Sequence, residues 1–81
     1  MIIRTRAHFP MRGEPTVTAT VTVDGVRHTE RGTAGAAGVG YLAHEYVART
    51  LAKRLGLADF HDASAIVRLG YRFTTTKETT P

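Results

Sequence analysis

The sequence predicts an α+β domain of the order β-β-β-α-β, in which a mainly antiparallel four-stranded sheet carries one helix on one face. Two observations predict it. Four segments alternate apolar residues with arginine, histidine or threonine, as half-buried strands do, and one later segment repeats apolar residues at helical spacing. The 81 residues suffice for one domain with a modest core. A single helix covers a single face, so we expect the opposite face of the sheet to stay open.

The four expected strands lie at 2–9, 16–23, 26–31 and 65–73. Residues 16–23 alternate threonine with valine or alanine, a composition that is typical of a strand with one buried face. Asp24 and Gly25 stand between the second and third strands, and such a pair readily adopts the positive φ angles of a type I′ turn. We therefore expect a tight hairpin there.

The helix is expected at 39–55. Its apolar stripe consists of Ala43, Val47, Leu51 and Leu55, which recur at the spacing of one helix face. Gly56 follows directly, and glycine is the favoured residue just beyond a helix C-terminus. This stripe is expected to cover the apolar face of the sheet.

The remaining segments suggest a simple organisation. Residues 57–64 have the composition of a polar turn. We assign 1–73 to a single folded domain and 74–81 to a flexible, threonine-rich C-terminal tail. The chain contains no cysteine, which excludes disulfides and thiolate metal sites within it. No leader peptide and no apolar run long enough to cross a membrane is visible, so we expect a cytoplasmic protein without a membrane partner.

The charge balance favours an acidic partner. The formal net charge is +4, and nine of the eleven basic residues are arginine. Arginine gives planar, bidentate contacts to phosphate and carboxylate groups. We therefore expect nucleic acid or an acidic protein surface as the partner.

The main candidate for a binding site is the open face of the sheet, where the residues between the apolar positions are basic or threonine. Such a face contacts phosphate groups without reading a base sequence. Phe9, Tyr71 and Phe73 are expected on the apolar face, and the lack of aromatic residues among the arginines argues against base stacking. The candidate binding residues are Arg4, Arg6, His8, Arg27, Arg31, Arg68 and Arg72.

Leu42 and Tyr46 form a second candidate contact. They project away from the apolar stripe of the helix, toward the side that carries Arg49 and Lys53. Two apolar residues four positions apart on a charged side indicate a partner contact or the seam of a homodimer. The alternative, which we leave open, is that the helix rolls slightly and buries both residues at the margin of the core.

The glycine-rich segment 32–40 precedes the helix and offers backbone N–H groups to an anion. Residues 31–38 within it resemble the pyrophosphate loop of acyl-CoA-dependent N-acetyltransferases, and the resemblance implies acyl-CoA or another anion as a ligand. No Gly-Lys-Ser or Gly-Lys-Thr is present, so a Walker A loop is excluded. A flexible connector is the interpretation that we favour, because glycine-rich segments are often linkers.

The histidine and carboxylate residues do not predict a metal or catalytic site. His44 and Glu45 begin the zinc-binding pattern H-E-x-x-H, but Ala48 stands where the second histidine is needed. The expected polar turn contains three possible ligands, Asp59, His61 and Asp62, but a metal there would need further ligands from elsewhere. We expect no metal, no cofactor and no enzymatic activity.

These observations predict a small, non-enzymatic basic binding module that contacts nucleic acid through the arginine-bearing face. The alternative is a protein-interaction module, a small accessory or inhibitor protein that binds an acidic partner surface or a second copy of itself. A third interpretation is the binding of acyl-CoA or another anion at the glycine-rich loop.

Overall fold

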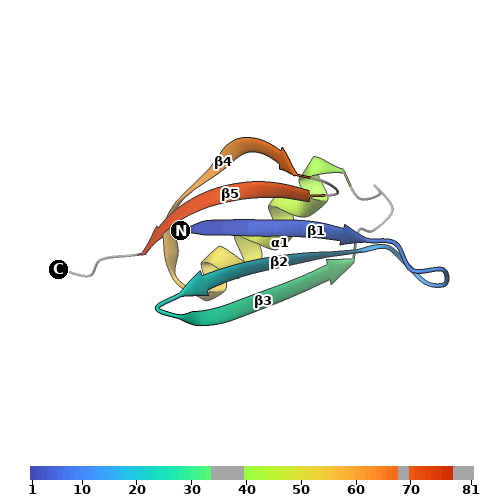
Figure 1. Ribbon diagram of the computed structural model, residues 1–81, viewed down its shortest axis with the longest axis horizontal. Helices are drawn as coiled ribbons and strands as arrows, with labels where there is room; N and C mark the ends of the chain where they lie inside the picture. The colour runs from blue at the N-terminus through green and yellow to red at the C-terminus, as the bar shows by residue number, and fades with distance from the viewer. Residues whose placement is uncertain (34–39, 68–69, 78–81) are drawn as a thin grey trace.

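The computed structural model describes residues 1–33, 40–67 and 70–77, and these residues form one helix and five strands (Figure 1). The α+β class is confirmed, but the sheet has one strand more than the four expected. The elements in chain order are β1 (Ile2–His8), β2 (Thr16–Val23), β3 (Val26–Thr33), α1 (Tyr41–Arg54), β4 (Leu57–Val67) and β5 (Gly70–Lys77).

The sheet is antiparallel throughout and has the strand order β3-β2-β1-β5-β4. β1 therefore lies at its centre, between β2 and β5. α1 lies across one face of the sheet, behind the strands in the view of Figure 1, and it packs against all five of them. Among the described residues no helix covers the opposite face, so the expected open face is present.

The C-terminal third differs from the expectation. Residues 57–64, expected to form a polar turn, belong to β4, and the expected strand at 65–73 is divided between β4 and β5. Residues 74–77, assigned to the tail, continue β5 and pair with β1 and β4. The rest of the expected tail, 78–81, lies outside the described residues.

The sequence pattern did not predict β4 because the pairing of this strand with β5 is irregular. Its register against β5 shifts between Ala58 and His61 and again between Asp62 and Ile66, and Asp59 has a φ angle of 51°. A bulge changes the face to which the following side chains point, so the two-residue period of a strand is lost. β4 is also an edge strand, and its exposed polar residues have the composition of a turn.

The tight hairpin between β2 and β3 is confirmed. Asp24 and Gly25 both have positive φ angles, 51° and 79°, as a type I′ turn requires. Val23 pairs with Val26 directly across the turn. β3 continues to Thr33, two residues beyond the expected strand.

The ends of α1 lie close to the expected limits. The helix begins at Tyr41, with Gly40 as its N-cap, and ends at Arg54. Gly56 has a φ angle of 68°, and its N–H donates a hydrogen bond of 3.2 Å to the carbonyl oxygen of Lys53. The glycine that was expected to end the helix does so.

The core lies between α1 and the inner face of the sheet. Val47 and Leu51 of the helix are buried against the sheet, but the helix is rolled relative to the expected stripe. His44 is only 2% exposed, whereas Ala43 is partly buried at the margin. The sheet contributes Ile3, Val17, Ala19, Val21 and Phe73 to this core.

The hydroxyl of Thr5 forms a polar bridge inside the core. It lies 2.7 Å from Nδ1 of His44 and accepts a hydrogen bond of 3.0 Å from the backbone N–H of Tyr71. The last residue of β1 that pairs with β5 is Arg4, one position before Thr5. The Thr5 hydroxyl therefore gives the N–H of Tyr71 a partner at the point where the β1–β5 ladder ends. A buried polar group left without a partner costs about 1–3 kcal/mol, so the bridge matters for stability.

We predict that Gly70→Ala lowers the free energy of unfolding by about 1–3 kcal/mol. A Cβ atom on Gly70 would collide with the backbone carbonyl of Thr5, so β5 would have to move away from β1. Urea denaturation followed by circular dichroism measures the change. The matched control is Gly40→Ala, because a Cβ atom there meets no atom within 4 Å. Equal stability of the two variants would contradict the close approach of the strands.

Candidate functional site

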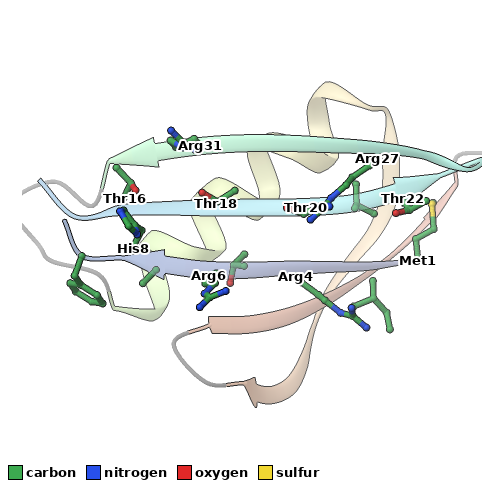
Figure 2. A pocket seen from close by; sticks show the side chains of 15 residues that line it. Met1, Arg4, Arg6, His8, Thr16, Thr18, Thr20, Thr22, Arg27 and Arg31 are labelled. Atoms are coloured by element: carbon green, nitrogen blue, oxygen red, sulfur yellow. The ribbon is translucent and has the colours of Figure 1, made fainter.

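The open face of the sheet is hollowed over β1, β2 and β3. The hollow has a volume of about 1570 Å³. Figure 2 shows that the labelled arginines come from the two outer strands of the three, while the threonines follow β2 between them. The outward-pointing basic and hydroxyl side chains that line this hollow, called the cationic hollow below, are Arg4, Arg6, His8, Thr16, Thr18, Thr20, Thr22, Arg27 and Arg31.

The strand register brings two arginines of the cationic hollow into one cross-strand row. Thr18 of β2 pairs with Arg6 of β1 on one side and with Arg31 of β3 on the other. The backbones of β1 and β3 are roughly 10 Å apart, because each strand spacing is about 4.8 Å. Arg6 and Arg31 therefore lie on the two sides of a threonine floor.

No acidic residue is among the described residues that line the cationic hollow. Glu30 is the one acidic residue within β1, β2 and β3, and it pairs with inward-facing Ala19. It therefore points to the helix side, where Arg54 lies 3.2 Å from its carboxylate. The other ion pair among the described residues, Arg49 with Glu45 at 3.8 Å, also lies on the helix. Neither of these two ion pairs involves an arginine that lines the hollow.

The structure brings together most of the predicted binding residues, but not all of them. Arg4, Arg6, His8, Arg27 and Arg31 line the cationic hollow. Arg68 and Arg72 were also expected on this face, and Arg68 lies outside the described residues. Arg72 is directly opposite Arg4 in the ladder but does not line the hollow.

Arg72 differs from the arginines of the hollow in its surroundings. It is half-buried, and its Nε atom is buried without a hydrogen-bond partner among the described residues. Its neighbour Arg4 is exposed and carries the same charge. Like charges directly opposite each other in a sheet are destabilising, so this pair adds to the positive potential at some cost in stability.

The expectation that no aromatic residue lies near the arginines is wrong. Phe9 was placed on the core face, but its side chain is 53% exposed and lines the cationic hollow. The reason is that β1 ends at His8, so the alternation of faces does not continue to Phe9. Pro10 is the residue that indicates the end of β1 in the sequence, because proline restricts the residue before it and has no N–H for a ladder.

Leu42 and Tyr46 are exposed on the outer side of α1. Their exposed fractions are 74% and 72%, so the alternative that the helix roll buries them at the core margin is wrong. The helix is rolled the other way, toward His44, which it brings to Thr5. The exposed Arg49 and Lys53 lie on the same outer side.

A second cluster of polar groups lies at the helix and away from the hollow. The hydroxyl of Tyr41 donates a hydrogen bond of 3.1 Å to Glu45. Its partial burial, followed by the nearby carboxylates of Asp62 and Glu45, raises the pKa of Tyr41 to about 12. Tyr41 therefore keeps its proton near neutral pH and acts as a hydrogen-bond donor beside the helix.

The described residues do not form a metal centre. Within them, no three histidine, aspartate or glutamate side chains lie close enough together to hold a metal ion. His44, the first residue of the broken zinc pattern, is buried in contact with Thr5. The predicted anion site of the glycine-rich segment falls mainly on residues 34–39, which lie outside the described ranges.

No protein-family model matches the chain, and no curated protein and no solved structure matches it either. In the described ranges, no helix has the length and apolar character needed to cross a membrane. What the molecule binds is therefore inferred from the chemistry of its surface.

Proposed function

We propose that the protein is a small, non-enzymatic binding module that contacts the phosphate backbone of nucleic acid through the cationic hollow. The observation that carries the proposal is that arginines from β1 and β3 flank a floor of threonines, with no acidic residue at the outward positions of these strands. A cytoplasmic location, expected from the sequence, belongs to the same proposal.

The side chains of the hollow have the chemistry that phosphate groups require. A guanidinium gives two parallel hydrogen bonds to one phosphate, and it keeps its charge at every physiological pH. Threonine hydroxyls donate further hydrogen bonds, and protein–DNA contacts to phosphate use both residue types. Arg6, Thr18 and Arg31 form such a set across the hollow.

The placement of Arg4 and Arg6 on the same face of one strand favours a polyanion over a patch of carboxylates. Arg4 and Arg6 are two residues apart on β1, which places their Cα atoms roughly 6.6 Å apart. A nucleic-acid strand carries its phosphates at a fixed repeat along its backbone, so a strand that lies over β1 can present separate phosphates to both arginines. The carboxylates of an acidic protein surface have no such fixed repeat.

We predict that the chain binds a fluorescein-labelled oligonucleotide in low salt and that binding weakens linearly in a plot of log K against log salt. The double variant Arg6→Ala/Arg31→Ala removes two phosphate contacts. It should therefore lower the magnitude of the slope by about 1.4 to 1.8, the value expected for two lost contacts on single-stranded or duplex nucleic acid. Fluorescence anisotropy from about 50 to 200 mM salt measures the slope.

The control is Lys53→Ala, which removes a positive charge from the exposed side of α1 instead of from the hollow. It should leave the salt slope unchanged. Absence of binding to single-stranded and duplex probes at about 50 mM salt would overturn the proposal. A Lys53→Ala effect as large as that of one hollow arginine would show that net charge alone is responsible.

A second candidate function is a protein contact through the outer side of α1. The observation that favours it is the exposure of Leu42 and Tyr46 next to each other, one helical turn apart. Apolar residues at this spacing are typical of helices that pack against a partner. A second copy of the chain is the partner that is tested most simply.

For this second candidate we predict reversible self-association that is lost in Leu42→Asp, because the carboxylate would be buried without a partner in the seam. Sedimentation velocity over a micromolar to millimolar concentration range measures the mass. Met11→Asp is the control, because Met11 is fully exposed in the loop after β1. A wild-type chain that stays monomeric over the whole range contradicts a homodimer.

A further inference from the structure

Phe9 gives one end of the cationic hollow an apolar ring. It follows β1 directly and lines the hollow together with His8, whose partner in β2 is Thr16. Both residues are exposed, and Phe9 keeps 53% of its surface accessible. An aromatic ring and an imidazole beside a row of arginines form the combination with which proteins bind bases and phosphates together.

The rest of the hollow has room for one backbone between its two sides. The strands β1 and β3 that carry the arginines are roughly 10 Å apart, and the floor between them consists of threonine hydroxyls. A phosphodiester chain that lies along this floor has cations on both sides. Arg6 and Arg31 are opposite each other at the middle of the floor, across Thr18.

A duplex offers few base faces on which Phe9 can stack. In a duplex the faces of the bases are stacked on one another, so an aromatic side chain on a backbone-binding surface reaches them only at an end or a kink. In a single strand each base has a free face that stacks on an aromatic side chain, and this stacking tolerates any sequence. The exposed ring therefore distinguishes between the two forms of nucleic acid.

We propose that the cationic hollow binds single-stranded nucleic acid, with a base stacked on Phe9 at the His8 end and the adjoining phosphates held by Arg6 and Arg31. This inference rests on the proposed function and adds the substrate class to it. Phe9 contributes a contact without charge, whereas the arginines contribute charged contacts. The two kinds of contact are separable by salt.

The test compares a labelled oligodeoxythymidylate of ~15 nucleotides with a labelled duplex of equal length by fluorescence anisotropy, in matched buffers from about 50 to 200 mM salt. We expect tighter binding of the single strand. Phe9→Ala should weaken it roughly five- to a hundredfold, the range that loss of one stacked base gives, with an unchanged salt slope. Phe9→Tyr keeps the aromatic face and should retain most of the affinity.

Met11→Ala is the matched control, because Met11 is an exposed apolar residue of the same loop that does not line the hollow. It should bind the single strand as the wild type does. Equal affinity for duplex and single strand, together with no effect of Phe9→Ala, overturns the single-strand inference and leaves the proposed phosphate contact standing. Absence of binding to both probes overturns the two together. Circular dichroism melting of Phe9→Ala confirms that the variant is folded.

Discussion

The composition of both faces of the sheet depends on the register of its central strand, β1. Ile3, Thr5 and Ala7 point toward the helix, and the residues between them point outward, so a slip of one residue would bring arginines into the core. The polar bridge fixes this register. Thr5 is the inward residue whose hydroxyl meets His44 and the N–H of Tyr71, and a displaced β1 would leave both groups buried without that partner. The hydrogen bond between Thr5 and His44 holds the His44 side of α1 against β1, so Leu42 faces solvent.

With the register fixed, the separation of charge follows from the sequence. The arginines of β1 and β3 share one face, and Glu30 is turned to the other, where Arg54 neutralises it. Concentrated like charge lowers the stability of the folded chain, and the Arg4–Arg72 pair is the closest case in the ladder. A bound polyanion would remove that repulsion. For this reason we propose a phosphate-bearing ligand for the hollow in preference to a neutral one.

Much of the N-terminal half of the fold could be predicted because local rules determine it. The two-residue period gave β1 to β3, the Asp24–Gly25 pair gave the hairpin, and a glycine gave the helix end. The rest depends on contacts between distant segments. The bulges of β4 interrupt the two-residue alternation of its side chains, so residues 57–64 were expected to form a turn. Phe9 follows the last residue of β1, where the period no longer assigns a face. The roll of α1 follows from a buried hydrogen bond between residues 39 positions apart.

We propose that binding occurs on the open face and not on the helix. The most direct test is an NMR titration of the labelled chain with single-stranded oligonucleotide, observing backbone amides and arginine Nε–H groups. We predict that the largest shift changes occur at Arg4, Arg6 and Arg31, with the amides around Phe9 changing alongside them. Changes concentrated at Leu42 and Tyr46, with the open face unaffected, would contradict it.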